Sequence, residues 1–462
     1  MTISQALIKE YLKITGSSQV LTEDADRLAY SYDAAVLTPI APALVVAPAT
    51  AEQLGRVVKL TYDNDLPMTI RGSGTNLSGA VIPEPGDSVV ILTNRLNKIL
   101  EINQEDLYAV IEPGVITGLF AETVAKEGLF YPPDPGSLTV STLGGNVALN
   151  AGGLRGLKYG VTKDYLMGLE FFDYKGDLVK TGSRTVKCVT GYNLGGLMIS
   201  SEGTLGVFSK IILKLIPPPK ASEAMMAIYD DVNKASETVA AIIANHILPC
   251  TLEFIDQKCL KLVSAHANVA LPIEAAAILL IEVDGAHKAG VEEDANKNKE
   301  ICGKIGAKSV IVAQNPEEKD KIWTARRNVL PSLARAKPTT VLEDATVPRS
   351  KIPAMVSEVS RIAAKLNLEI GLFGHAGDGN LHPTIMCDRR NLEEFKRVEA
   401  AVDEIFDVAI KLQGTLSGEH GVGQAKAKWM VKETNQATVE FSKNLRRAID
   451  PKYLFNASKK VI

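Results

Sequence analysis

A glycine-rich run, Arg71-Gly72-Ser73-Gly74-Thr75-Asn76-Leu77-Ser78-Gly79, directly follows a short β-like segment at residues 68–70. Glycine lets the backbone approach a ligand closely, and successive free N–H groups in such a loop form a nest for phosphate oxygens. Three hydroxyl side chains in the run add donors, and its arginine adds positive charge. The run is not a Walker loop and does not match GxGxxG with a following acidic residue. Alone, it fits a surface turn as well as a phosphate-binding loop.

Two more glycine-rich segments follow within the same half of the chain. Residues 132–160 contain Pro-Pro-Asp-Pro-Gly-Ser, then Ser-Thr-Leu-Gly-Gly-Asn, then scattered glycines, and residues 201–207 read Ser-Glu-Gly-Thr-Leu-Gly-Val. This much glycine would weaken elements that merely filled a core. It is expected where backbone wraps a long, flat, polar ligand. The three segments together therefore predict a large nucleotide cofactor.

Length and composition favour a multidomain globular protein. The 462 residues exceed what one compact core usually holds, so we expect two or more domains. With 51 basic and 54 acidic residues the net charge is −3, which gives no basic face for nucleic acid. The most apolar stretch, residues 275–281, is far too short to span a bilayer and is predicted to be a buried strand. We therefore expect no integral membrane segment.

The clearest domain boundary is the triple proline at residues 217–219, which neither a helix nor a central strand can accommodate. Short β-like runs alternate with helical patterns before it, and longer helical periodicities lie between β-like runs after it. We predict an α+β fold with a first domain at residues 1–220 and a second at 221–444. Residues 445–462 are expected to return to the first domain.

The five cysteines are scattered and include no CxxC pair. An odd number without a framework favours a reducing cytosol and buried thiols over disulfides or an iron–sulfur cluster. The first residues, Met1-Thr2-Ile3-Ser4-Gln5, show neither the cationic start nor the apolar core of a signal peptide. We expect a cytoplasmic protein.

Two histidines of the second half are placed to bind one metal ion. In the stretch from Leu372 to Pro383, His375 and His382 flank Asp378-Gly379, a strong signal for a two-residue hairpin turn. With that turn, His375 directly opposes His382, with Cβ atoms roughly 5 Å apart on one face. Such a pair can chelate a divalent ion, or it can be a cross-strand histidine pair without metal.

A carboxylate and an imidazole stand side by side at Glu419-His420, in a segment that glycines on either side make permissive. Two histidines and a carboxylate form a common divalent-metal set, which admits zinc, manganese or iron(II).

The glycine loop at 71–79, the Pro-Pro-Asp-Pro segment with its Thr-x-Gly-Gly, and Ser-Glu-Gly-Thr-Leu-Gly resemble the FAD-binding half of the vanillyl-alcohol oxidase family. Over nearly its whole length the chain is similar to the branch with FAD-dependent D-lactate dehydrogenases, the glycolate oxidase flavin subunit and D-2-hydroxyglutarate dehydrogenases. The resemblance implies a two-part FAD-binding domain and an α+β substrate domain with an antiparallel sheet. It also implies FAD contacts from residues 71–79 and from Pro133, Asp134, Ser137, Thr142, Gly144, Gly145, Asn146, Ala151, Gly152, Gly156, Tyr159, Gly160, Glu202, Gly206, Val207 and Asn456.

We expect the flavin to be bound without a covalent link. Relatives that attach FAD use a histidine or cysteine, but the first histidine here is His246. Thr75 stands where a linking histidine would be expected, and Cys188 is the only cysteine of the first domain.

The resemblance also implies roles in the second domain. His375, His382 and Glu419 would bind the metal ion, and His420 would be the catalytic base. Arg326 would hold the substrate carboxylate, because arginine offers planar, bidentate donors. Its neighbour Arg327 could take that place instead.

Where hydroxyglutarate-type relatives carry a lysine for a second carboxylate, this chain has Leu342. This favours a short monocarboxylic D-2-hydroxy acid, with D-lactate first and glycolate or D-2-hydroxyglutarate as alternatives. The expected electron acceptor is a protein, either an electron-transferring flavoprotein or an iron–sulfur subunit. A non-catalytic flavin relay subunit and a non-redox transferase remain the alternatives of other classes.

Overall fold

The computed structural model describes residues 3–267 and 269–460, which fold into two compact units. The first unit comprises residues 1–151, 161–218 and 419–462, and the second comprises residues 152–160 and 219–418. The expected boundary at residue 220 lies within the same proline-rich linker as the observed one. Two features differ from the expected domains: the return to the first unit begins at Glu419 rather than 445, and residues 152–160 belong to the second unit.

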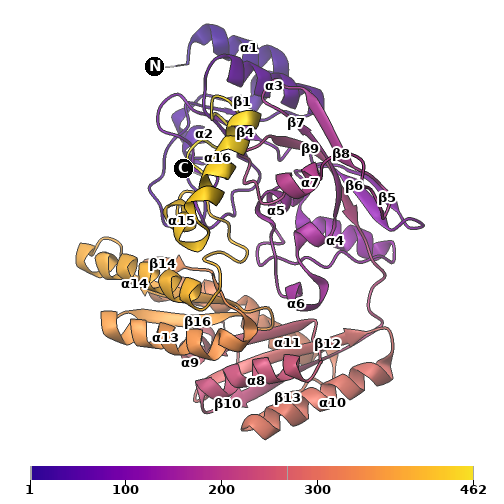
Figure 1. Ribbon diagram of the computed structural model, residues 1–462, viewed down its shortest axis with the longest axis vertical. Helices are drawn as coiled ribbons and strands as arrows, with labels where there is room; N and C mark the ends of the chain where they lie inside the picture. Colours follow the sequence, from indigo (N-terminus) through magenta and orange to yellow (C-terminus); the bar gives the residue numbers. More distant parts are fainter. Residues whose placement is uncertain (1–2, 268, 461–462) are drawn as a thin grey trace. The chain divides into compact units, whose positions relative to one another are not determined.

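Two sheets build the first unit (Figure 1). One has the order β1-β2-β4-β3, in which β2, β4 and β3 are parallel. The other is antiparallel, with the order β5-β6-β9-β7-β8. The strands are β1 Val20–Leu21, β2 Leu44–Val46, β3 Met68–Arg71, β4 Val89–Leu92, β5 Ile99–Asn103, β6 Tyr108–Ile111, β7 Leu166–Phe172, β8 Leu178–Gly182 and β9 Val207–Lys214.

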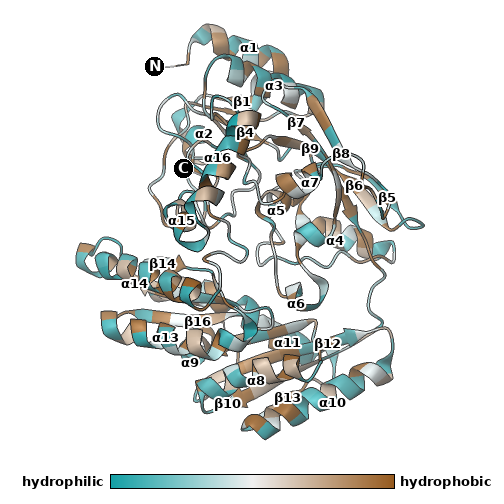
Figure 2. Cartoon of the chain, in the orientation of Figure 1, coloured by the Kyte–Doolittle hydropathy of each residue, from teal (hydrophilic) through white to brown (hydrophobic). Residues whose placement is uncertain are grey.

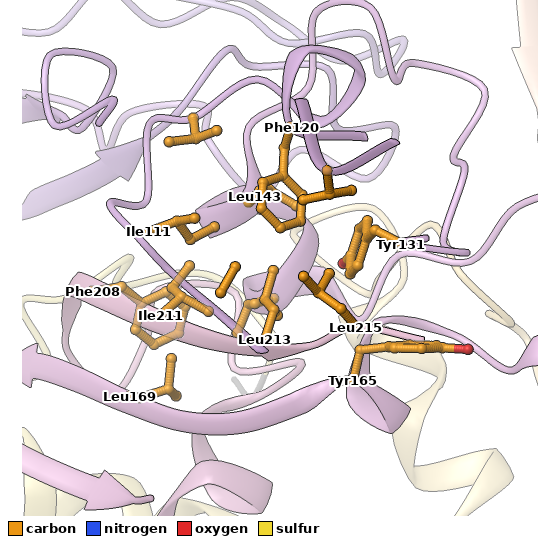
Figure 3. Packing of buried hydrophobic residues seen from close by; sticks show 14 of the residues in the cluster. Ile111, Phe120, Tyr131, Leu143, Tyr165, Leu169, Phe208, Ile211, Leu213 and Leu215 are labelled. Carbon is orange, nitrogen blue, oxygen red and sulfur yellow. The ribbon is translucent and has the colours of Figure 1, made fainter. Parts of the chain in front are cut away.

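The helices of the first unit pack on these sheets and leave glycine-rich loops between elements. They are α1 Gln5–Thr15, α2 Asp24–Leu28, α3 Ala51–Asp63, α4 Thr117–Lys126, α5 Leu143–Leu149, α7 Leu194–Met198, α15 Met430–Glu433 and α16 Gln436–Ile449. A buried core lies between α4, α5 and the antiparallel sheet (Figure 3). In it, the rings of Phe120 and Tyr131 pack edge to face, with their centroids 5.1 Å apart. Its buried apolar residues fix the loops that connect these elements.

The end of the chain is tied to strand β3 of the first unit. The backbone N–H of Met68 donates to Leu454 at 2.8 Å, and the N–H of Asn456 donates to Met68 at 2.8 Å. The buried guanidinium of Arg446 on α16 donates to the carbonyls of Phe455 and Asn456 at 2.7 and 3.1 Å. The C-terminal return therefore places Asn456 beside the first glycine loop.

An eight-stranded sheet with only antiparallel pairings forms the centre of the second unit. Its order is β13-β10-β12-β11-β16-β17-β14, with β15 also paired to β17. The strands are β10 Ala221–Tyr229, β11 Thr251–Asp256, β12 Ala277–Gly285, β13 Ser309–Val312, β14 Thr339–Leu342, β15 Ala345–Thr346, β16 Glu369–His375 and β17 Asn380–Cys387.

Helices cover both faces of this sheet. They are α6 Gly156–Tyr159, α8 Val232–Ala244, α9 Gln257–Ala267, α10 Lys288–Ile305, α11 Pro316–Arg327, α12 Val329–Ala336, α13 Ile352–Leu366 and α14 Leu392–Lys411. A buried cluster joins α9, α11 and α12 to one face of the sheet, while α8, α10, α13 and α14 pack elsewhere on its strands. These helices show hydrophilic and hydrophobic residues along their lengths (Figure 2), as amphipathic helices do. The face under α9, α11 and α12 also carries His375 and His382.

Most segments expected from periodicity are present. The helical patterns at 51–64, 234–245, 351–366 and 392–412 correspond to α3, α8, α13 and α14, and the apolar run at 275–281 enters the buried strand β12. One expectation was wrong: Cys188 is exposed, whereas the other four cysteines are buried. No helix in the described part of the chain combines the length and apolarity needed to cross a membrane.

Candidate active site

A cavity in the first unit is lined by all three glycine-rich segments. It is open to solvent, and its empty space, with the open solvent at the mouth included, is about 530 Å³. Its lining residues are Ile70, Gly72, Ala80, Val81, Thr93, Pro113, Gly144, Gly145, Ala148, Leu149, Glu202, Gly203, Gly206, Phe208 and Asn456. Apolar side chains and bare backbone predominate, which suits a flat cofactor held by main-chain groups and van der Waals contact.

The cavity brings together six of the residues expected to contact a cofactor: Gly72, Gly144, Gly145, Glu202, Gly206 and Asn456. Several of these glycines are also required by internal packing. A Cβ on Gly72 would lie 2.3 Å from the hydroxyl of Thr142, and one on Gly144 would lie 2.6 Å from Pro113. A side chain at either position would push the loops apart.

Asn456 joins three segments at the cavity wall. Its side-chain oxygen accepts from the N–H of Ile70 at 2.8 Å. Its amide nitrogen donates to the carbonyls of Ala80 and Glu202 at 3.1 and 2.7 Å. The side chain thereby ties the C-terminal return to the first and third glycine-rich segments.

We expect Asn456→Ala to lower the free energy of unfolding by roughly 3 kcal/mol or more, because buried backbone groups left without partners cost about 1–3 kcal/mol each. The residue also has φ +41°, a conformation that asparagine tolerates better than alanine. The affinity for FAD should fall together with the free energy of unfolding. Denaturant unfolding and flavin fluorescence titration measure both quantities. Asn64→Ala, which removes an exposed amide bonded to Leu60, is the control, and equal effects of the two variants would contradict the role of Asn456.

Arg71 supports the first glycine loop from within the protein. Its Nη1 donates to the carbonyl of Tyr32 at 2.8 Å, and its guanidinium lies 5.7 Å from the ring centre of Tyr30. Burial lowers the pKa of Arg71, an effect that the nearby Asp33 opposes. Gly74, at φ +75°, lies so close that a Cβ would meet the guanidinium at 2.1 Å. Arg71 is not among the residues lining the cavity, and its expected contact with the cofactor stays a prediction.

Two other expected contacts take structural positions at helix α5. The hydroxyl of Thr142 accepts from the N–H of Gly145 at 3.2 Å and caps the helix. Asn146 is buried and donates to the hydroxyl of Thr117 at 2.8 Å. Both residues fix the backbone that carries Gly144 and Gly145.

Gly152, Gly156, Tyr159 and Gly160 lie in the part of the chain that belongs to the second unit. The phenol of Tyr159 donates to Asp284 at 2.8 Å, and this bond raises the pKa of Tyr159 further above its usual range, in addition to the larger effect of burial. Tyr159 thereby attaches this segment to strand β12 of the second unit.

The loop at residues 419–423 is anchored within the first unit. The amide of Asn76 donates to the carbonyl of His420 at 3.0 Å. The carboxylate of Glu202 accepts from the N–H groups of Val422 and Gly423 at 2.8 and 2.7 Å. Gly423, at φ +50°, leaves no room for a side chain, since a Cβ would lie 2.0 Å from the carbonyl of Ser78. The first and third glycine-rich segments therefore hold the loop that carries His420.

The histidine hairpin of the second unit has a different register from the one expected. His375 pairs with Asn380, and His382 pairs with Phe373. The loop contains four residues, 376–379, closed by the N–H of Asp378 donating to His375 at 3.2 Å. Gly379 still takes a positive φ of +90°, as its turn signal predicted. The two-residue turn was wrong because the N–H of Gly377 donates to Leu252 on β11 at 2.9 Å, which holds Gly377 in the loop.

The two histidines still meet, as diagonal neighbours on one sheet face. Their ring centroids are 5.1 Å apart with perpendicular planes, and both side chains are buried. His382 also lies beside Asp344, whose carboxylate oxygen is 3.9 Å from Nδ1. In each pair, His375 with His382 and Asp344 with His382, the ligand atoms lie within 4.8 Å of one another. His382 thus has an imidazole and a carboxylate within ligand distance, and both are donor types that bind divalent cations.

A buried carboxylate, Glu253 on β11, bonds His375 and Arg326. Oε1 of Glu253 lies 2.7 Å from Nδ1 of His375, and Oε2 accepts from Nε of Arg326 at 2.5 Å. Burial alone would raise the pKa of Glu253, but the adjacent His375 and Arg326 outweigh it and hold that pKa below its usual value.

Arg326 lies in the last turn of helix α11, above this face, with its guanidinium 4.9 Å from the ring centre of Phe373. The adjacent Arg327 is exposed and bonds Asp320 on its own helix at 2.6 Å. Only Arg326 therefore stands with the histidines.

Comparisons with known proteins identify the family of the chain. Residues 42–182 match the family model described as "FAD binding domain", and residues 218–460 match "FAD linked oxidases, C-terminal domain". The chain belongs to the family of FAD-linked oxidases. FAD is accordingly its cofactor, and the glycine-lined cavity lies in the half that matches the FAD-binding model.

Among curated FAD-linked oxidases, the glycolate oxidase subunit GlcD of Bacillus subtilis is 45% identical, with 99% of this chain and 97% of the relative covered. A D-lactate dehydrogenase of Anaerostipes hadrus is 31% identical over 99% and 97% of the two chains. The solved structure of p-cresol methylhydroxylase with substrate bound superimposes with a TM-score of 0.82 at 18% identity, over 98% and 96% of the chains. The expected two-part FAD-binding domain and α+β second domain of vanillyl-alcohol oxidase type are thereby confirmed.

Two residues of this FAD-linked oxidase were missed by sequence reasoning. Asp344 precedes the short strand β15, and Glu253 interrupts the apolar strand Thr251–Asp256. A charged residue in a strand that is otherwise buried was the available signal, because an ionised group is buried only with partners.

Proposed function

We propose that the protein oxidises a short D-2-hydroxy acid, D-lactate or a close relative, to the 2-oxo acid with non-covalently bound FAD. The observation that carries this proposal is the group on one face of the second unit's sheet. There, His375, which lies against His382, bonds the same carboxylate of Glu253 as Arg326 does. A site for a divalent cation beside a site for a carboxylate suits a 2-hydroxy acid, whose carboxylate and hydroxyl stand on adjacent carbons.

The chain's residues have separate roles in this proposal. Arg326 holds the substrate carboxylate, and His375, His382 and Glu419 hold the cation. When bound, FAD supplies a hydride acceptor at N5 and the cation supplies a Lewis acid that stabilises alkoxide character at the hydroxyl. His420 takes the hydroxyl proton as general base. Anchoring of its backbone by Asn76 and of its loop by Glu202 supports this role.

Leu342 supports a short substrate. It follows Val341 on β14 and pairs with Thr384, so it lies on the face that carries His382. Its side chain packs against the apolar cluster that includes Phe373. A second carboxylate at this position would meet hydrocarbon without a cation, which disfavours D-2-hydroxyglutarate. Glycolate, named in the relative that is 45% identical, is the alternative substrate.

The electron acceptor in this proposal is a protein partner, either an electron-transferring flavoprotein or an iron–sulfur subunit. The name of the 45%-identical relative, a subunit, supports an assembly of several chains. A relay subunit without activity of its own has no use for Arg326, and this argues against that alternative.

Anaerobic reduction of the bound flavin tests the proposal. The oxidised flavin band is followed after separate additions of D-lactate, L-lactate, glycolate and D-2-hydroxyglutarate, before and after treatment with a chelator. We expect D-lactate to bleach the band and the chelator to prevent it. Bleaching mainly by D-2-hydroxyglutarate would contradict the argument from Leu342. No bleaching by any of these acids would favour the relay subunit or a non-redox transferase.

A further inference from the structure

Glu253 is fully buried in strand β11, between Leu252 and Phe254, which are also buried. A buried ionised carboxylate is costly unless it is paired and hydrogen-bonded, and an apolar residue would serve a purely structural strand better. Phe254 pairs with Gly374, which places Glu253 beside His375 on the neighbouring strand. The carboxylate must therefore be explained by what its two oxygens hold.

The first oxygen fixes the orientation of the His375 ring. Oε1 lies 2.7 Å from Nδ1 of His375, so the hydrogen bond between the two side chains uses Nδ1. The other ring nitrogen, Nε2, is then the one that can face a cation. A histidine held in this way presents a defined and more basic nitrogen to a cation.

The second oxygen fixes the orientation of Arg326. The bond from Nε to Oε2, together with the Phe373 ring under the guanidinium, determines the plane of that group. In the described part of the chain, the side-chain hydrogen bond of Arg326 uses Nε alone, so both Nη groups remain to donate to a ligand. These two groups can bind a carboxylate in the bidentate manner.

We propose that Glu253 is a positioning residue that couples cation binding to substrate-carboxylate binding, by holding His375 and Arg326 with one carboxylate. The inference rests on the proposed function and deepens it. Glu253 binds neither the cation nor the substrate, yet the affinity for both depends on it. Loss of Glu253 should therefore weaken cation binding and substrate binding together.

The test compares the full-length, FAD-loaded wild type with Glu253→Gln after removal of metal by a chelator. Zinc affinity is measured without substrate by competition with a chromophoric chelator, and KM and kcat are measured with the preferred hydroxy acid. We expect zinc affinity to fall by about 10- to 100-fold, the usual effect of losing such a partner. KM should rise about tenfold or more, because hydrogen bonds to charged groups contribute about 1.5–3 kcal/mol.

The matched control is Glu282→Gln. Glu282 lies on the adjacent strand β12 and bonds Lys319, which is on the same helix as Arg326, at 2.7 Å. Both glutamates tie α11 to the sheet, but within the described part of the chain Glu282 bonds no histidine. We expect the control to keep wild-type zinc affinity and KM. Equal losses in the two variants would mean that Glu253 only anchors the helix, and would overturn the inference.

If Glu253→Gln fails to fold, Glu253→Asp takes its place in the test. Aspartate keeps the carboxylate but is one methylene group shorter, so the carboxylate lies farther from His375 and Arg326. Zinc affinity and KM should then both worsen, and wild-type values in a folded Glu253→Asp would overturn the inference. The proposed function fails separately: a wild type that binds no zinc and whose flavin no hydroxy acid reduces would overturn both. If a chelator prevents flavin reduction in the wild type but Glu253→Gln keeps wild-type zinc affinity and KM, the inference is overturned and the proposed function stands.

Discussion

Replacing His382 with asparagine is expected to remove tight divalent-cation binding and to lower kcat by about a thousandfold or more. His382 is buried, and its ring centroid lies 5.1 Å from that of His375. Its Nδ1 lies 3.9 Å from a carboxylate oxygen of Asp344. It is the residue shared by both pairs of candidate ligands in the second unit. A bound cation contributes several kcal/mol of charge stabilisation to such a reaction, and about 1.4 kcal/mol corresponds to a tenfold rate.

Metal analysis, flavin content and anaerobic flavin reduction together check this prediction. The flavin should remain, because the residues lining the cofactor cavity belong to the first unit. His266→Asn is the control, since His266 is exposed at the end of helix α9. Full activity of His382→Asn in the absence of metal would mean that the two histidines form a cross-strand pair with no metal role.

The cofactor half of the molecule could be predicted well because its signal is local. Gly72, Gly144 and Gly206 stand where a side chain would collide with neighbouring atoms. The need for glycine at these positions is therefore visible in the sequence as glycine-rich segments. Asn456 could be proposed only through a resemblance. Its hydrogen bonds reach Ile70, Ala80 and Glu202, and no local pattern encodes partners so far away in the chain.

The register of the histidine hairpin shows where turn chemistry is insufficient. Asp378-Gly379 predicted a turn at the right place, and Gly379 has the expected positive φ. The length of the loop depends on Gly377, which bonds Leu252 on another strand. A shift of pairing by two residues keeps side chains on the same face. His375 and His382 are therefore neighbours in the observed register as well as in the expected one.

Glu253 could not have been assigned from the sequence, because its role depends on tertiary pairing. Strand β11 lies more than a hundred residues before β16 in the chain, and only the sheet order places them side by side. Helix α11 then adds Arg326 from above the same face. An acidic residue between buried apolar neighbours in a strand signals that a partner exists but does not identify it.

Arg326→Lys is expected to lower kcat/KM for the hydroxy acid by about 100- to 1000-fold. Lysine keeps the charge but loses the planar fork that can hold a carboxylate with two hydrogen bonds, and it loses the Nε bond to Glu253. Loss of two hydrogen bonds to charged groups, at about 1.5–3 kcal/mol each, accounts for an effect of this size. Zinc affinity should fall less than in Glu253→Gln, because Glu253 still bonds His375.

Arg327→Lys is the matched control, because Arg327 is exposed and bonds only residues of its own helix, Asp320 and Thr324, within the described chain. A neutral analogue, D-lactamide, separates carboxylate binding from general damage to the site. The Arg326→Lys defect should be much smaller with the amide than with the acid, because the lost hydrogen bonds are to a charged group. Equal defects with both compounds would place Arg326 in the support of the fold. A large defect in Arg327→Lys would instead exchange the roles of the two arginines.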